Sequence, residues 1–349
     1  MTGDNPFGRP EPEPEPGPEP GPGPEAGPEA GPEAGPEAGP EAGPAAGPAA
    51  GPEAGPEDRA GQEAGPSLTA ELLREFLAAG SDALARLASD EGAVDDFGFD
   101  PDLTDELILP LLRPLYEKYF RVEVEGLEHV PADGGALVVA NHSGTLPLDA
   151  LMLQVALRDD HPAHRRLRLL AADLVFELPL VRDIARKAGH VRACRAHATR
   201  LLQAGELVGV MPEGYKGLGK PYEERYRLRR FGRGGFAAVA LRTGRPLVPC
   251  AIVGAEETYP MIGESRTLAR MLNLPYFPIT PTFPLLGVLG LVPLPSKWTI
   301  RFGAPITVDG FPEGAAEDPR TVEKLAREVK DTIQHSLNEL LAERQSPFG

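Results

Sequence analysis

Two stretches of the chain place residues capable of acid–base chemistry directly after an apolar run. In the first, His142 follows the apolar run 136–140, and Asp149 comes seven residues later. An imidazole with a pKa near ~6.5 accepts a proton at neutral pH, and a neighbouring carboxylate fixes its tautomer. His142 and Asp149 are therefore predicted to act as a general base and its orienting group. The alternative is structural: the histidine hydrogen-bonds a turn and the aspartate caps a helix.

In the second stretch, the apolar run 207–211 ends in Pro212-Glu213-Gly214. Ligands of open α/β sheets bind at the carboxyl ends of the strands, so the two polar stretches are expected to share one crevice. Residues 214–220 also match the phosphate-loop pattern G-x-x-x-x-G-K, but Pro221 stands where that loop needs a Ser or Thr. We therefore do not expect a nucleotide site in this stretch.

A sheet with intervening helices is needed to bring the two stretches together, and the hydrophobic pattern supplies one. Apolar runs predict strands at 121–125, 136–140, 167–171, 207–211, 247–253 and 298–302. Helices are predicted at 147–157, 181–188, 196–204 and 234–242, with a closing helix from about Pro319 that buries Val322, Leu325, Val329, Ile333, Leu337 and Leu340. Strands alternating with helices imply the α/β class, with a largely parallel central sheet and helices on both faces.

Further helices are expected before the sheet. An amphipathic pattern predicts a helix at 67–88, and an acidic loop follows at 90–100. A second helical stretch is expected at 103–120, bent or broken by Pro110 and Pro114, because proline cannot donate a helical hydrogen bond.

The first 66 residues differ from the rest in composition. They hold 18 of the 40 prolines, 15 of the 40 glycines, and 14 acidic against two basic residues, largely in Gly-Pro-Glu-Ala repeats. They account for −12 of the net charge of −17 and have almost no apolar bulk to offset the entropy of ordering. We predict a disordered tail at 1–66, an N-terminal helix and acidic loop at 67–102, and the functional domain at 103–345.

Removing residues 1–66 is expected to leave the melting temperature and the specific activity nearly unchanged, because a segment with almost no apolar bulk contributes little to a core. Thermal unfolding and turnover of the truncated protein, beside the full-length chain, measure this. An insoluble or inactive truncated protein would contradict the prediction.

The remaining composition bears on location. Two cysteines, Cys194 and Cys250, fit a reducing compartment, and the first 66 residues lack the apolar core of a signal peptide. The uncharged run 271–296 contains six prolines, which excludes a regular membrane-spanning helix there. We expect a soluble or surface-bound cytoplasmic protein.

The two polar stretches together resemble the glycerolipid acyltransferase superfamily, in particular the 1-acylglycerol-3-phosphate acyltransferases. Its hallmarks N-H-x-x-x-x-D and F-P-E-G-T-R are similar to Asn141-His142 with Asp149 and to Pro212-Glu213-Gly214. The resemblance spans about 103–341, and the N-H-S-G-x-L-P-x-D pattern is most similar to an actinobacterial branch. This chain departs from the family in three ways: six residues instead of four separate the histidine from the aspartate, Met211 replaces Phe, and Tyr215-Lys216 replaces Thr-Arg.

The resemblance implies an enzyme that moves a fatty acyl group from an acyl thioester to the hydroxyl of a lysophosphatidate-like glycerolipid in phospholipid synthesis. His142 would deprotonate the hydroxyl with Asp149 orienting the ring, and backbone N–H groups near Gly144 or Gly214 would meet the oxyanion. The implied acceptor-binding residues are Glu213, Gly214, Lys216, Arg225 and Arg230, the last two from the basic run 225–233. Neither a metal nor a cofactor is implied, and acyl-CoA or acyl carrier protein is the co-substrate.

The implied partners are these substrates and a membrane surface, at the inner face of the cell membrane, and not nucleic acid. The proline-rich apolar run 274–295 is then either a buried irregular core segment or a membrane-facing lip, and lipid access to His142 favours the lip. The sequence leaves open transfer to a neutral acceptor such as diacylglycerol and non-catalytic lipid binding. Nucleic-acid binding through the run 225–233 is disfavoured by the net acidity.

Overall fold

The computed structural model describes residues 94–143 and 146–348, so the tail and the helix expected at 1–88 lie outside the described residues. Within these residues, seven strands form one sheet in the order β1-β9-β6-β2-β5-β3-β4. The strands are β1 Glu123–Glu125, β2 Ala136–Ala140, β3 Leu167–Ala171, β4 Val191–Arg192, β5 Leu207–Val210, β6 Leu247–Val253 and β9 Thr299–Phe302. All neighbours are parallel except β6 and β9, so the expected largely parallel sheet is confirmed.

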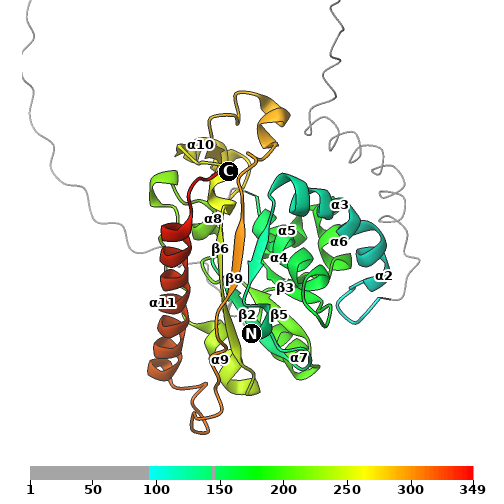
Figure 1. Cartoon of the computed structure of the whole chain (residues 1–349), viewed down its shortest axis with the longest axis vertical. Helices are drawn as coiled ribbons and strands as arrows, with labels where there is room; N and C mark the ends of the chain where they lie inside the picture. Colours follow the sequence, from blue (N-terminus) through cyan, green and yellow to red (C-terminus); the bar gives the residue numbers. More distant parts are fainter. Residues whose placement is uncertain (1–93, 144–145, 349) are drawn as a thin grey trace, which may run out of the picture. The chain divides into compact units, whose positions relative to one another are not determined.

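Helices cover both faces of the sheet (Figure 1). The α-helices of the described residues are α2 Pro101–Leu103, α3 Leu109–Pro114, α4 Leu148–Asp159, α5 Asp173–Glu177, α6 Pro179–Lys187, α7 Arg195–Gln203, α8 Tyr215–Leu218, α9 Gly235–Thr243, α10 Arg266–Met271 and α11 Pro319–Glu343. One core joins a face of the sheet to α7, α9 and α11, and the other joins the opposite face to α3 and α4. The six residues of the closing helix predicted to be buried are all buried in α11.

The central strands are buried on both faces. Every residue of β2 and β6 is buried, as the continuous apolar runs of central parallel strands predict. In the parallel register, Leu137 of β2 lies opposite Val208 of β5 and Leu247 of β6. Residues that follow β2 and β5 therefore leave the sheet at the same edge, which brings the two polar stretches together.

The helix expected at 103–120 is not interrupted at its prolines. It runs through α2 and α3 with two π-helical turns, Thr104–Ile108 and Leu115–Tyr119, whose last bonds reach from Leu109 N to Thr104 O and from Phe120 N to Leu115 O. Widened turns beside Pro110 and Pro114 accommodate residues that cannot donate, so the chain stays helical where the sequence suggested a break.

The proline-rich run contains structure that the sequence did not indicate. Its short strand β8 Pro278–Ile279 pairs antiparallel with β7 Gly263–Glu264, and a 3-10 helix follows at Gly287–Leu291. The centre of the run is not a buried core segment, because Leu285 and Val288 are 83% and 81% exposed. Within the described residues, every helix falls short of the length or hydropathy required to cross a bilayer.

Candidate active site

His142 and Asp149 meet at the carboxyl edge of the sheet despite the six residues between them. His142 follows β2, Asp149 lies in the first turn of α4, and Nδ1 of His142 is 2.8 Å from Oδ2 of Asp149. The Asp149 side chain is fully buried, whereas 12% of the His142 side chain is exposed. The same carboxylate accepts the N–H groups of Ser143 and Ala150. With Nδ1 donating to Asp149, Nε2 carries the lone pair that a general base needs.

Asn141 fixes the place where β2 ends. Its side-chain amide donates to the carbonyl of Ile252 at 3.0 Å and accepts the N–H of Ile252 at 2.7 Å. This buried side chain continues the hydrogen bonding between β2 and β6 by one position beyond the last pair, Ala140 with Cys250. The sequence identified Asn141 only as part of a motif; its role in holding the following histidine is a finding of the structure.

Glu213 holds the main chain of His142. Its Oε1 accepts the N–H of His142 at 3.0 Å, and its Oε2 accepts the N–H of Arg229 at 2.6 Å. The Glu213 side chain is fully buried, and charge-assisted bonds to backbone N–H groups are stronger than neutral ones. Both carboxylate oxygens thus position the polypeptide, while a contact of Glu213 with the acceptor stays a prediction.

Gly217 allows α8 to lie directly against His142. A Cβ at this position would be 2.7 Å from the carbonyl oxygen of His142 and 2.9 Å from Cβ of Glu213. Neither neighbour is a flexible chain end, so any larger residue would displace the histidine backbone. The sequence offers one signal for this contact, the cluster of glycines after Pro212-Glu213-Gly214.

A buried ammonium group lies next to Glu213. The Lys220 side chain is 1% exposed, and its Nζ is 3.1 Å from Oε1 of Glu256 and 3.6 Å from Oε2 of Glu213. Oε1 of Glu256 also accepts the N–H of Tyr226. Burial raises the pKa of Glu256 to about 7, against the lowering effect of Lys220. The ammonium group of Lys220 therefore lies beside two carboxylates, those of Glu213 and Glu256. With a pKa of about 7, Glu256 changes its charge near neutral pH. The sequence indicated Lys220 only as the lysine of a phosphate-loop pattern that was rejected, and it did not indicate Glu256.

The predicted acceptor-binding cations differ in their placement. Lys216 is exposed on α8, next to the glycine that packs on the histidine, and Arg230 is exposed next to the residue whose N–H Glu213 accepts. The guanidinium of Arg225 lies 4.3 Å from the ring centroid of Tyr222 and donates to the carbonyl of that residue. Lys216 and Arg230 thus belong to segments that contact His142 directly or through Glu213, whereas Arg225 contacts Tyr222 within its own turn.

The backbone donors predicted for an oxyanion are only partly described. Gly214 forms the turn between β5 and α8 with φ 57° and ψ −148°, a conformation that glycine tolerates best. Its N–H donates to the carbonyl of Met211 at 3.1 Å. That donor is engaged in the turn, and an oxyanion contact with other backbone N–H groups near Gly214 stays a prediction. Gly144 lies outside the described residues.

His190 is partly buried and contacts a buried glutamine. Its Nε2 is 3.0 Å from Oε1 of Gln154, and burial lowers the pKa of His190 to about 4. The imidazole is therefore neutral at physiological pH, and its contact with Gln154 is structural.

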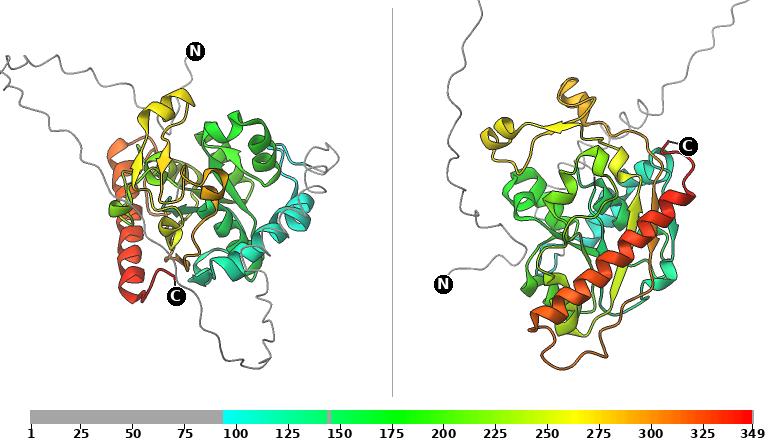
Figure 2. Two further views of the ribbon diagram at one scale, coloured as in Figure 1. Left: turned by 90° about the horizontal axis from the view of Figure 1, so that it is seen from above. Right: turned by 90° about the vertical axis from the view of Figure 1, so that its left-hand side faces the viewer.

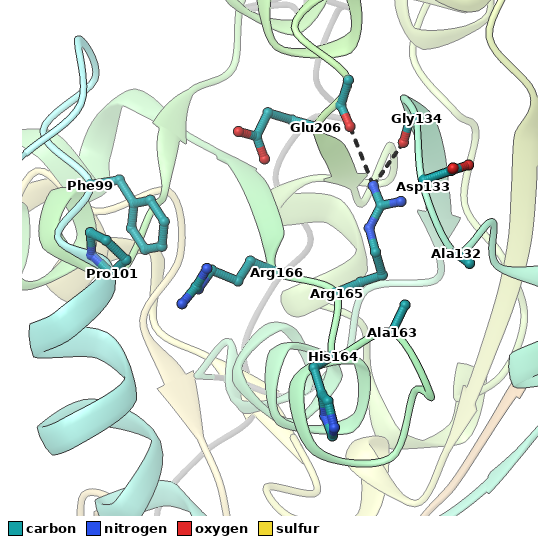
Figure 3. Close-up of a pocket in the computed structure, with 11 residues that line it drawn as sticks. Phe99, Pro101, Ala132, Asp133, Gly134, Ala163, His164, Arg165, Arg166 and Glu206 are labelled. Atoms are coloured by element: carbon teal, nitrogen blue, oxygen red, sulfur yellow. Dashed lines mark hydrogen bonds between the residues drawn. The ribbon is translucent and has the colours of Figure 1, made fainter.

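A cavity of about 380 Å³ lies at the opposite, amino-terminal edge of the sheet, among the segments that precede β2, β3 and β5 (Figure 3). Arg165 donates there to the carbonyls of Gly134 and Gly205, at 2.7 Å and 3.4 Å, and so ties two of these loops together. His142 is not among the lining residues, and ligands of such sheets bind at the carboxyl edge. The cavity is therefore distinct from the candidate active site.

Residues 121–253, which include His142 and Glu213, match the model of the family described as Acyltransferase. The chain is 55% identical over 276 residues to a protein of Mycobacterium tuberculosis described as uncharacterized, covering 79% of this chain and 77% of the relative. It is 26% identical over 218 residues to the "DGAT1/2-independent enzyme synthesizing storage lipids" of Bos taurus, covering 61% of this chain and 58% of that protein. A solved structure, the 1-acyl-sn-glycerophosphate (LPA) acyltransferase PlsC of Thermotoga maritima, is similar with a TM-score of 0.49 and 20% identity, covering 80% of this chain and 96% of that chain.

Proposed function

Because this chain belongs to the acyltransferase family, we propose that it transfers a fatty acyl group from an acyl thioester to the hydroxyl of a phosphorylated, lysophosphatidate-like glycerolipid. The observation that carries this proposal is the 2.8 Å contact between His142 and Asp149 at the carboxyl edge of the sheet. The exposed cations Lys216 and Arg230, on segments that pack around this pair, support an anionic acceptor, since cations bind phosphate through charge-assisted hydrogen bonds.

In the proposed reaction, Nε2 of His142 takes the proton of the acceptor hydroxyl while the hydroxyl oxygen attacks the thioester carbonyl carbon. Asp149 holds the ring through Nδ1–H and stabilises the imidazolium that forms. The tetrahedral intermediate collapses by breaking the carbon–sulfur bond, and the imidazolium returns its proton to the departing thiolate. Coenzyme A or acyl carrier protein carries the acyl group, and no covalent intermediate forms on the enzyme.

We also propose that the protein acts as a peripheral protein at the inner face of the cell membrane, in phospholipid synthesis. The proposed acceptor and product are lipids that reside in the bilayer, so an enzyme dissolved in water away from the membrane would encounter little of its acceptor. Nucleic acid is not a proposed partner, because the chain carries a net charge of −17.

Transfer to a neutral acceptor such as diacylglycerol is the second candidate. The observation that favours it is the 26% identity to a bovine enzyme named for the synthesis of storage lipids. A neutral acceptor would give the exposed cations on α8 and on the segment 225–233 no phosphate to bind, and for this reason we rank it below the phosphorylated acceptor.

Product analysis distinguishes the candidates. The purified protein is given acyl-CoA, and separately acyl carrier protein loaded with the same acyl chain, with lysophosphatidate and diacylglycerol in mixed micelles, and the products are identified by mass spectrometry. Phosphatidate as the main product supports the proposal. Triacylglycerol as the main product would instead support the second candidate, transfer to diacylglycerol. A folded protein that forms neither product but binds the lipids would support the non-catalytic alternative.

Replacing Lys216 or Arg230 by Ala is expected to raise KM for lysophosphatidate about 10-fold or more, the magnitude of a hydrogen bond to a charged group. KM for the thioester should change little, because mainly ground-state binding of the acceptor is lost. Initial rates with each substrate varied in turn measure this split.

Lys324→Ala, on the exposed side of α11, is the matched control and should leave both KM values unchanged. The competing explanation is that Lys216 and Arg230 only attract the bilayer. The two variants would then lose activity on anionic vesicles but keep a normal KM for a short-chain, soluble acceptor, and that outcome would raise the neutral acceptor above the phosphorylated one.

A further inference from the structure

Exposed apolar side chains are concentrated on one part of the surface. Ten of the sixteen exposed large apolar side chains in the described part of the chain fall within 262–292. We call them the apolar tip: Ile262, Leu268, Met271, Leu272, Leu285, Leu286, Val288, Leu289, Leu291 and Val292. Large exposed apolar patches on soluble domains mark sites that contact other molecules or membranes.

The apolar tip consists of two projections and not of a groove. One is α10 with its flanks, and the other is the loop that contains the 3-10 helix Gly287–Leu291. In Figure 1 and in the right-hand view of Figure 2, both extend beyond the end of the sheet, on the same side of the molecule. A convex surface of this kind suits insertion between lipid molecules better than the capture of a helix or a peptide strand.

The second projection is held in place at its base. The hydroxyl of Tyr259 donates to the carbonyl of Leu291 at 2.6 Å, and that of Tyr119 donates to the carbonyl of Pro293 at 2.7 Å. Within the loop, Leu286 N donates to Thr282 O at 2.8 Å. Because these contacts anchor the loop, its leucines and valines are presented outward by a fixed backbone.

The segment 265–308, which carries most of the apolar tip, has a net charge opposite in sign to that of the whole chain. The chain has 52 acidic residues and a net charge of −17, yet no Asp or Glu occurs in residues 265–308. Arg266 and Arg270 on α10 are exposed beside the apolar side chains, and Arg266 also contacts Glu264 at 3.1 Å. An anionic bilayer repels most of this protein and attracts this segment, so electrostatics selects the face that approaches the membrane.

The base of the apolar tip reaches the candidate active site. A Cβ on Gly219, just after α8, would lie 3.2 Å from Cδ1 of Tyr276, which precedes β8. Burial and, after it, the charge of Asp149 raise the pKa of Tyr276, so this ring lies within electrostatic reach of the catalytic carboxylate. The segment that carries the projections is therefore continuous with the wall of the site.

We propose that the apolar tip is the surface by which this protein docks on an anionic bilayer. Its aliphatic side chains insert among the acyl chains, while Arg266 and Arg270 lie at the level of the phosphate headgroups. The carboxyl edge of the sheet, with His142, then faces the lipid from which the acceptor is drawn. The proposal rests on the proposed function only for that last step, because docking itself requires no catalysis.

Vesicle flotation of the full-length protein, without acyl donor or acceptor, tests the docking surface. The variant Met271→Asp/Val288→Asp changes side chains that are 76% and 81% exposed, so a loss of folding is not expected. Partition onto phosphatidylcholine vesicles that contain phosphatidylglycerol should weaken roughly tenfold for each substitution, the loss expected when one aliphatic side chain no longer leaves water. Val94→Asp is the matched control, since Val94 is 53% exposed and lies outside the apolar tip, and its partition should equal that of the wild type.

Arg266→Ala/Arg270→Ala tests the electrostatic part. Partition should fall about fivefold for each arginine on anionic vesicles and stay unchanged on pure phosphatidylcholine. The proposal is overturned if the wild type binds neither vesicle, or if the aspartate variant binds as tightly as the wild type. It is also overturned if the wild type is a dimer in solution that Val288→Asp dissociates, since the face would then join two copies. A wild type that docks as expected but forms no acylated product in the assay above would refute the proposed function alone.

Discussion

Replacing His142 by Ala is expected to lower kcat about 10²- to 10⁴-fold, the usual contribution of a positioned proton transfer. In the proposed reaction Nε2 of His142 takes the hydroxyl proton, and alanine leaves no base at that place. Turnover of acyl-CoA and lysophosphatidate at saturating concentrations measures kcat, and a melting curve shows whether the variant is folded.

Two further variants separate catalysis from folding. Asp149→Asn keeps the size of the side chain but removes the charge that stabilises the imidazolium, so kcat should fall with the fold intact. His335→Ala, on the exposed surface of α11, is the matched histidine control and should keep wild-type turnover. If His142→Ala retained most of the wild-type rate, the assignment of the general base would be wrong, whatever the result for Asp149.

The sequence predicted the central strands well because their burial dictates their composition. A parallel strand covered on both faces is largely apolar, and β2, β3 and β6 have the bounds that the sequence indicated, although β3 contains the buried Arg168. Helix α11 is equally clear, since one apolar stripe repeats along its length. The two-residue strands β4, β7 and β8 are too short to show any period, and the sequence did not indicate them.

The proximity of His142 and Asp149 was predicted, but the buried Lys220 and Glu256 beside Glu213 were not. His142 and Asp149 are near neighbours in sequence, and their side chains meet although six residues separate them. Lys220 and Glu256, in contrast, are 36 residues apart and meet only because their segments pack beside the end of β5. The exposure of the proline-rich run was one of two alternatives, because an apolar composition alone does not distinguish a core segment from a projecting one, and lipid access to His142 favoured the projecting one.

Replacing Lys220 by Met is expected to lower the free energy of unfolding by roughly 3–5 kcal/mol, the typical cost of removing one partner from a buried ion pair. Methionine fills similar space, but Glu213 and Glu256 then share a buried site without a cation. Because Glu213 holds the N–H of His142, kcat of the folded variant should fall as well. Denaturant unfolding and turnover below the melting temperature measure the two effects. Lys324→Met on exposed α11 is the control and should change the unfolding free energy by no more than about 0.5 kcal/mol.

The carboxylate of Glu256 makes the free energy of unfolding depend on pH. The pKa of Glu256 is about 7 in the folded protein against an ordinary 4.5, so its contribution to stability is complete below about pH 4.5 and is lost as the pH rises to about 7. In Glu256→Gln this loss is absent, and the unfolding free energy of the wild type should fall relative to that of the variant over this range.

The double variant Lys220→Met/Glu256→Gln should be less destabilised than Lys220→Met alone, because one of the two unpaired carboxylates is gone. Strictly additive effects of the two substitutions would show that Lys220 and Glu256 do not interact, and a wild-type pH profile identical to that of Glu256→Gln would show that Glu256 does not titrate near neutral pH.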